Sequence, residues 1–206
     1  QGFNEVFIVI GLIILASGWA ATTLTLSAFS RGNGTIGILA SAIIACIAVW
    51  GVSEYFIRRR RMIAPSIALS IFWTLSVTWV LMILLLPASG FKYALLPNQI
   101  LTAGLITVAI AIFWARFRVP FAMAMIALGV FVSAMLLGSS TQDTPTDISD
   151  FFLLSATGPL AWITIVVGLG VFAVAMRFDL SDPYRVTRRS AQGFWLHVVA
   201  APALVN

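Results

Sequence analysis

The chain has 206 residues, of which 61% are hydrophobic and 9% are charged, and its mean hydropathy is +1.04. A soluble domain is usually about 45–50% apolar and about 25% charged, so this composition excludes a water-soluble globular protein and a disordered tail. A single cysteine, Cys46, excludes an internal disulfide, and a single histidine leaves no Cys/His zinc site. We therefore expect no metal and no cofactor.

Six stretches are long and apolar enough to cross a membrane as helices, since a span needs about 20 apolar residues. They contain no Asp, Glu, Lys or Arg except Glu54, which lies at the end of its stretch. In chain order they cover residues 6–27, 36–56, 63–86, 95–114, 119–137 and 158–176. A seventh apolar run starts near Gly193 and stops at Asn206. Because the period-two alternation of a β-barrel is absent, we expect an all-α polytopic transmembrane helix bundle. It would have six complete spans plus the start of a seventh, arranged as sequential hairpins in one domain over residues 1–206.

Lys and Arg are distributed unequally over the loops. One set of alternate loops holds ten of them and the other set holds two, Arg31 and Lys92. The positive-inside rule places the richer set, and with it residue 1, in the cytoplasm. The basic excess is then a topology signal, and we expect no nucleic-acid partner. The ten residues are Arg58, Arg59, Arg60, Arg61, Arg116, Arg118, Arg177, Arg185, Arg188 and Arg189.

Prolines follow the basic clusters at Pro65, Pro120 and Pro183, near the start of the next helix, where proline loses no backbone hydrogen bond. The clusters recur about every sixty residues, which indicates either a diverged internal repeat or hairpins of one membrane thickness. Asp182, directly before Pro183, predicts the N-cap of the truncated seventh helix.

Small residues line two of the predicted spans, and small residues let helices approach closely in lipid. We expect packing faces within the molecule, with a homodimer seam as the alternative. The faces are Gly37, Ser41, Ala45 and Ala48 on the second span, and Thr157, Ala161, Thr164 and Gly168 on the sixth.

Few ionisable residues lie near the spans, where they usually mark function. Glu54 precedes Arg58 by four residues, which predicts an ion pair on one helix. Glu5 precedes the first span, where a helix start tolerates an acid. His197 would lie about 10 Å into a helix starting near Ser190. A proton-relay or ligand role is one hypothesis for His197. We favour a histidine bonded to a carbonyl or hydroxyl of a neighbouring helix, because we find no acidic partner and no second histidine in the spans.

Polar side chains also cluster within the third span. A polar groove for a substrate is one interpretation, and we favour hydroxyls bonded to their own helix with tryptophans packed in the bundle. These residues are Trp73, Thr74, Ser76, Thr78 and Trp79.

Arginines beside the spans predict contacts with anionic lipid headgroups, with docking of a soluble partner as the alternative. The candidate contact residues are Arg58, Arg59, Arg185, Arg188 and Arg189.

Several stretches resemble an uncharacterised family of multi-pass inner-membrane proteins from alphaproteobacteria. They are residues 2–7, residues 54–61 with Pro65, residues 116–120, and residues 187–190 with 194–197. The resemblance is patchy between the two ends of the chain, and it implies topology and a bacterial inner-membrane location but no activity. Family members are expected to have a short soluble helical segment upstream and further spans downstream, which agrees with a chain that begins with Gln1 and ends in an apolar run.

No catalytic Ser/His/Asp, paired-carboxylate or metal pattern is present, so we expect no enzymatic activity. The leading hypothesis is a non-enzymatic subunit or accessory component of a larger membrane complex, or a homo-oligomer. The alternative is a transporter or channel for a neutral or lipid-like substrate.

The predicted threading has a direct test. A reporter fused within residues 141–150 should read out on the periplasmic side, because this loop belongs to the set poor in Lys and Arg. A matched fusion beside Arg118 should read out in the cytoplasm. Cytoplasmic activity of the first fusion would overturn the threading.

Overall fold

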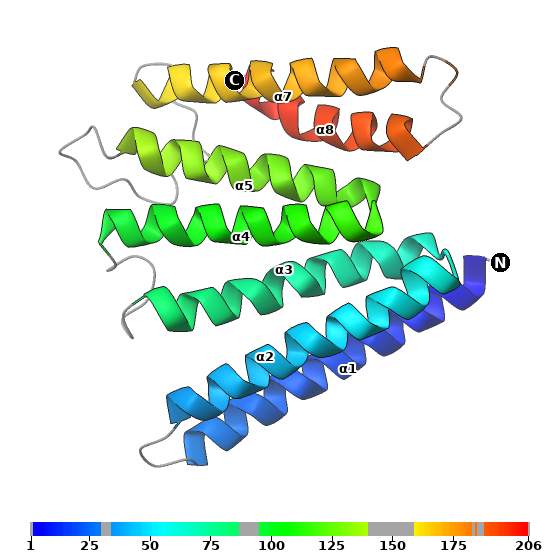
Figure 1. Ribbon diagram of the computed structural model, residues 1–206, viewed down its shortest axis with the longest axis vertical. Coiled ribbons are helices and arrows are strands. Elements are labelled where there is room, and N and C mark those ends of the chain that lie inside the picture. The colour runs from blue at the N-terminus through cyan, green and yellow to red at the C-terminus, as the bar shows by residue number, and fades with distance from the viewer. Residues whose placement is uncertain are drawn as a thin grey trace. The chain divides into compact units, whose positions relative to one another are not determined.

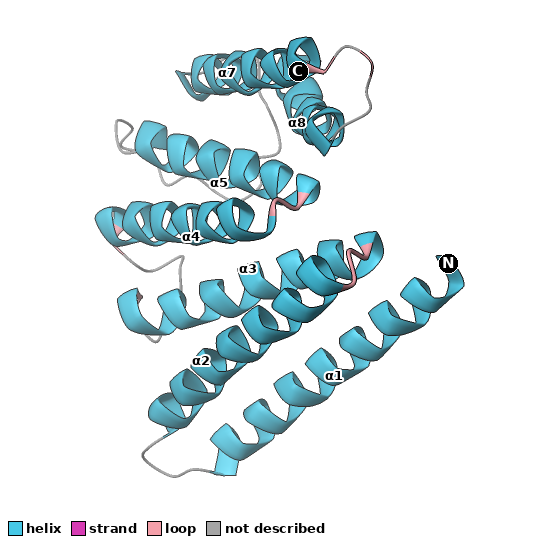
Figure 2. Ribbon diagram, turned by 45° about the vertical axis from the view of Figure 1, so that its right-hand side comes forward, coloured by secondary structure: helices cyan, strands magenta, loops and turns pink. Residues whose placement is uncertain are grey.

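The computed structural model describes residues 2–29, 34–86, 95–139, 159–182, 184 and 188–205. Within these ranges the chain forms helices and no strand (Figures 1 and 2). The predicted all-α architecture is therefore confirmed. The helices are α1 (Gly2–Phe29), α2 (Gly34–Ser53), the π-helix η1 (Glu54–Arg59), α3 (Ile63–Leu85), α4 (Leu96–Phe117), α5 (Pro120–Ser139), α7 (Pro159–Ser181) and α8 (Arg188–Val205).

Six of the described helices are long and apolar enough to cross a membrane: α1, α2 with η1, α3, α4, α5 and α7. Each has 20 to 25 residues in its candidate span, with a mean hydropathy between 1.9 and 2.3. A helix of 20 residues is about 30 Å long, the thickness of the hydrocarbon layer. The remaining helix, α8, begins with two arginines and corresponds to the predicted start of a seventh helix. The protein is a multi-pass integral membrane protein.

The contacts divide the chain into two compact units. The first comprises residues 1–93 with 115–119, and the second comprises residues 94–114 with 120–206. The expectation of one domain over residues 1–206 stays a prediction.

In the first unit, α2 and α3 form the tightest contact, and α1 packs on both of them. Ser53 of α2 and Ser70 and Leu69 of α3 are almost fully buried. Trp50 of α2 lies between two other rings, with centroids 5.0 Å from Trp73 and 5.1 Å from Phe117. This aromatic cluster ties α2 to α3 and to the last turn of α4.

In the second unit, α5, α7 and α8 meet around Ala127, Ala175 and Leu196. Gly168 permits the α7–α8 contact, because a Cβ there would lie 3.0 Å from that of Ala203. Thr164 is buried and donates to Met135 Sδ at 3.7 Å. The predicted packing face of the sixth span is thus confirmed at these two positions, whereas the side chains of residues 157 and 161 lie outside the described set.

Two turns share one geometry. Arg61 follows η1 and Arg118 follows α4, and both have a positive φ, 54° and 53°. A left-handed residue after a helix is a common stop signal, although glycine is the usual choice and arginine is strained there. The next helix carries a proline at its start in each case, Pro65 in α3 and Pro120 in α5. The prediction of proline at helix starts is confirmed for these two, and Pro183 lies outside the described residues.

Two details at the end of α7 differ from expectation. The helix continues past residue 176 to Ser181, so Asp179 is helical. The N-cap predicted at Asp182 is not seen in the described residues, because Tyr184 lies in a turn and the described part of α8 starts at Arg188. Instead Asp182 is buried directly after α7, and its N–H donates to the carbonyl of Asp179 at 3.2 Å.

The close approach of α4 and α5 predicts a sensitive position. An added Cβ at Gly129 would overlap the hydroxyl of Thr107, whose β-branched side chain is stiff and already donates to the Ala103 carbonyl. We expect Gly129→Ala to lower the free energy of unfolding by about 1–3 kcal/mol in detergent. Gly104→Ala on α4 is the matched control, since its Cβ would meet nothing within 4 Å. Equal stability of the two variants would contradict this packing.

Candidate functional site

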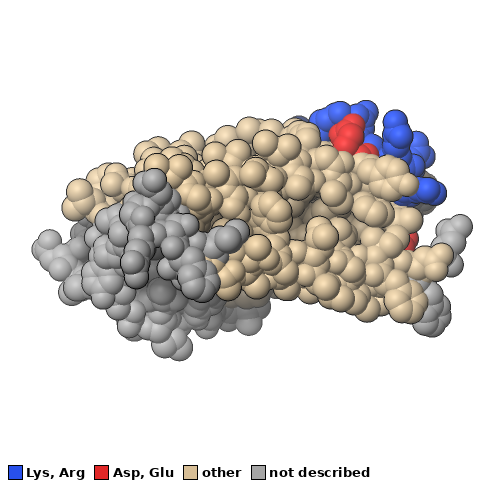
Figure 3. Space-filling view, turned by 90° about the horizontal axis from the view of Figure 1, so that it is seen from below, with Lys and Arg blue, Asp and Glu red and all other residues tan. Residues whose placement is uncertain are grey.

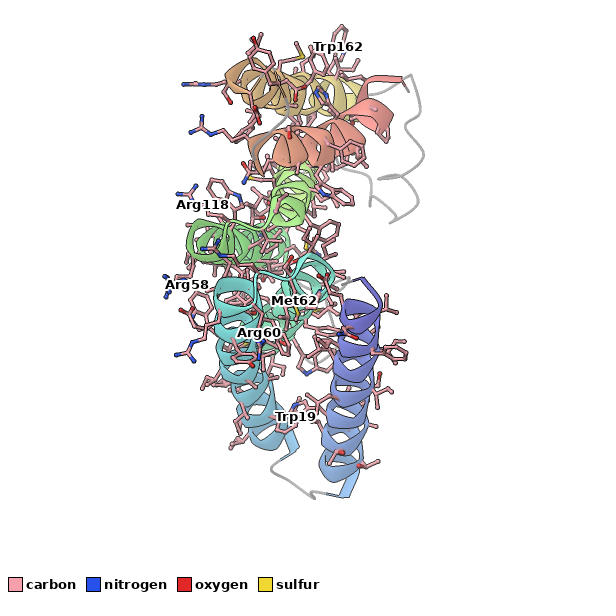
Figure 4. The ribbon with its side chains drawn as sticks, turned by 90° about the vertical axis from the view of Figure 1, so that its right-hand side faces the viewer. Trp19, Arg58, Arg60, Met62, Arg118 and Trp162 are labelled. Carbon is pink, nitrogen blue, oxygen red and sulfur yellow. The ribbon has the colours of Figure 1, made fainter. Side chains whose placement is uncertain are left out.

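An apolar groove of about 480 Å³ lies between α1, α2 and α3 of the first unit. Its volume falls within the range of about 300–1,000 Å³ that is typical of small-molecule sites. The groove is open rather than enclosed, because Leu15 and Leu75 on its walls are 70% and 60% exposed. Trp19 of α1 lies between α1 and α2 (Figure 4). The lining side chains are aliphatic or aromatic except those of Thr23, Ser41, Ser76 and Thr78, which carry hydroxyls, and the two tryptophans, Trp19 and Trp79, each carry an indole N–H.

The hydroxyls of Thr23 and Ser41 form a hydrogen bond across the groove at 2.7 Å. Thr23 also donates to the carbonyl of Trp19 at 2.8 Å, which uses its only hydroxyl proton. Ser41 must therefore donate to Thr23, and the Ser41 oxygen keeps lone pairs that can accept a hydrogen bond. The groove offers an acceptor to any molecule that enters it.

The polar and tryptophan residues of the third span were expected either to bond and pack within the bundle or to line a groove, and the structure shows both arrangements. Thr74 donates to the Ser70 carbonyl at 3.0 Å, and Trp73 packs against Trp50 with tilted rings, as we favoured. Ser76, Thr78 and Trp79 line the groove, which is apolar rather than the polar groove of the alternative. On α2, the small residues Ser41, Ala45 and Ala48 line the groove as well, whereas Gly37 faces open space.

A second candidate site is an arginine cluster at the end of η1 and in the last residues of α4, 115–117, which belong to the first unit. The predicted pair is confirmed, because Arg58 Nη1 lies 2.5 Å from Glu54 Oε1. The sequence did not predict that Arg116 Nη2 lies 2.9 Å from the same oxygen. The second oxygen of Glu54 is buried without a hydrogen-bond partner in the described structure. Glu54 therefore holds two guanidinium groups side by side.

The π-helix η1 adds a third fixed guanidinium to this cluster. A π-helix joins residues five apart, and the N–H of Arg60 donates to the Tyr55 carbonyl at 3.1 Å. The same five-residue spacing brings the side chains of Tyr55 and Arg60 together. Arg60 donates to the Tyr55 hydroxyl at 3.1 and 3.2 Å, and its guanidinium lies 5.6 Å from the ring centroid. Arg60 is thus oriented by a neutral partner.

Glu5 has a structural role that its position in the sequence did not indicate. Its carboxylate accepts a hydrogen bond at 3.0 Å from the backbone N–H of Ala64, in the first turn of α3. The first N–H groups of a helix have no partner within the helix, and an acid is favourable there. Glu5 therefore ties the start of α1 to the start of α3.

His197 has an acidic partner, which corrects the expectation that none exists. Its Nε2 lies 2.8 Å from Asp179 Oδ2, and both side chains are about 30% exposed. The glycine at 193 leaves room for this pair, because a Cβ there would lie 2.6 Å from Asp179 Oδ1. Phe172 of α7 packs against the imidazole with a centroid distance of 5.5 Å. No third metal-ligating side chain joins the pair within the described residues.

The structure brings only some of the predicted site residues together. Arg58 joins the cluster around Glu54, and Arg59 is exposed beside it. Arg189 is exposed on α8, in the second unit. Arg185 and the side chain of Arg188 lie outside the described residues. Contacts with lipid headgroups therefore stay a prediction for all five arginines.

The Asp179–His197 pair predicts coupled losses of stability. Asp179→Asn and His197→Gln should each lower the free energy of unfolding at pH 7 by about 1.5–3 kcal/mol, the usual effect of a charge-assisted hydrogen bond. The double variant should lose less than the sum of both. Arg177→Gln, at an exposed position on α7, is the control. Additive losses would show that the two side chains do not interact.

No family model, curated protein or solved structure matches this chain. The resemblance to an alphaproteobacterial inner-membrane family therefore stays a prediction.

Proposed function

We propose that this membrane protein binds an uncharged, lipid-like molecule in the groove between α1, α2 and α3, in a non-enzymatic role such as lipid transport. The observation that carries the proposal is the groove itself, about 480 Å³ in volume and lined almost wholly by apolar side chains. The three helices that form it are membrane-spanning by length and hydropathy. An open groove in a span faces hydrocarbon, so its occupant must be apolar.

The hydroxyls narrow the class of ligand. Ser41 donates its proton to Thr23 and keeps an acceptor, so a ligand hydroxyl is the complementary group. A charged headgroup is disfavoured, because no ionisable side chain lines the groove. We therefore expect a long-chain alcohol or a diacylglycerol-like lipid.

The second candidate is the accessory subunit, and the exposure of α1 favours it. None of the residues in the apolar window of α1 is buried in the described structure. Gly11 and Gly18 lie seven residues apart on that helix, and an added Cβ at either would meet nothing within 4 Å. Small residues on a lipid-facing surface allow a partner helix to approach closely.

The groove proposal is tested by filling the groove. The full chain, in native membranes, is labelled with a photoreactive diazirine derivative of a long-chain alcohol. Ala45→Phe places a ring in the groove, and we expect labelling to fall about tenfold, equivalent to about 1.4 kcal/mol of binding free energy. Ile44→Phe is the matched control, because Ile44 is 51% exposed and does not line the groove. Equal labelling of both variants would overturn the proposal.

Gentle extraction followed by native mass spectrometry separates the two candidates. A retained uncharged lipid at one per chain supports the groove proposal. A partner protein at fixed stoichiometry without a retained lipid supports the accessory subunit.

A further inference from the structure

We propose that the arginine cluster of the first unit is a binding site for a membrane lipid whose headgroup carries two negative charges. The site is separate from the apolar groove and does not depend on the function proposed for it. Its central residues are Arg58 and Arg116, held by Glu54, together with Arg60, held by Tyr55.

The charges of these residues do not cancel. Glu54 supplies one negative charge to the two guanidinium groups that it contacts. Tyr55, the partner of Arg60, is neutral. The three oriented arginines therefore retain two positive charges, and exposed Arg59 and Arg61 add more nearby. Figure 3 shows blue atoms gathered around a small red area at one end of the visible face, with a second, smaller red area below them, and no blue atoms elsewhere among the described atoms of that face.

The guanidinium groups are arranged for a phosphate. Arg58 and Arg116 bind Glu54 through one terminal nitrogen each, and their side chains remain 50% and 41% exposed. Each guanidinium therefore has further N–H donors, and a guanidinium binds phosphate through a planar fork. Because both groups touch one oxygen, they lie within about two hydrogen-bond lengths of each other. Such a pair can hold one phosphate without first losing side-chain freedom.

The position of the cluster favours a lipid over a soluble phosphate compound. Arg58 and Arg60 follow the apolar residues of α2, and Arg116 lies in the last turn of α4. The ends of membrane spans lie at the level of the lipid headgroups, and basic pockets between spans bind headgroups with several charges. Figure 4 shows Arg58 and Arg118 on the same side of the first unit. A headgroup with two phosphates matches the two retained positive charges.

The test uses the full chain purified in an uncharged detergent and mixed with defined lipids. The probes are tetraoleoyl cardiolipin, dioleoyl phosphatidylglycerol and dioleoyl phosphatidylcholine, and native mass spectrometry measures the lipid retained per chain. We expect cardiolipin to be retained about tenfold more than phosphatidylglycerol, with phosphatidylcholine weakest. Arg58→Gln with Arg116→Gln should abolish this preference. The control, Arg177→Gln with Lys92→Gln, removes the same charge at positions outside the cluster and should keep it.

A second variant distinguishes loss of the binding site from loss of folding. Arg58→Lys with Arg116→Lys keeps the charge and removes the planar fork, and we expect cardiolipin retention to fall about threefold or more while the chain elutes as the parent does. Unchanged retention in this variant, or equal loss in the control, would overturn the site. Millimolar pyrophosphate that displaces cardiolipin completely would show that the cluster binds free phosphate, and would also overturn it.

Discussion

The hydrocarbon of a bilayer contains no water that could hydrogen-bond a peptide group or a polar side chain, so each polar atom there must find a partner within the protein. Helices meet this requirement for the backbone. Hydroxyls such as those of Thr74 and Thr107 meet it by donating to the carbonyl four residues earlier. Asp179 and His197 meet it by pairing between α7 and α8. Where an acceptor has no proton to bind, as at the Ser41 oxygen in the groove, a ligand hydroxyl gains the most binding free energy.

Packing in the first unit explains why a groove forms there. Helices in lipid gain little from burying apolar surface, because lipid tails are as apolar as the side chains. The helices α2 and α3 make the most extensive contact of this unit, and two of their buried residues, Ser53 and Ser70, are small. Where Trp19 and Trp79 line the walls, the helices stay apart and a volume remains. The groove follows from an unequal distribution of small and large residues over three helices. A lipid or a partner helix is the kind of molecule that would occupy it.

The sequence predicted the spans well, because hydropathy over about 20 residues is a local property. It located the ion pair of Glu54 with Arg58 for the same reason, since both lie on one helix. It missed Arg116 and Asp179 as partners, because those contacts depend on the register between helices. The sequence also predicted the end of the sixth span too early, at residue 176, because Arg177 is charged. A charge marks where the apolar layer ends, and the helix runs on to Ser181.

The bond from Glu5 to Ala64 also has a consequence for biogenesis. The two residues are 59 positions apart, so α1 leaves the ribosome long before the N–H that it will bind. Domains form from the N-terminus during synthesis, and α1 must wait in lipid until both α2 and α3 are inserted. The candidate span of α1 has a mean hydropathy of 2.1, which allows α1 to stay in the lipid before α2 and α3 are inserted. The order of insertion therefore makes α3 the helix that fixes the start of α1, and in a chain stalled before residue 64 the carboxylate of Glu5 would lack this partner.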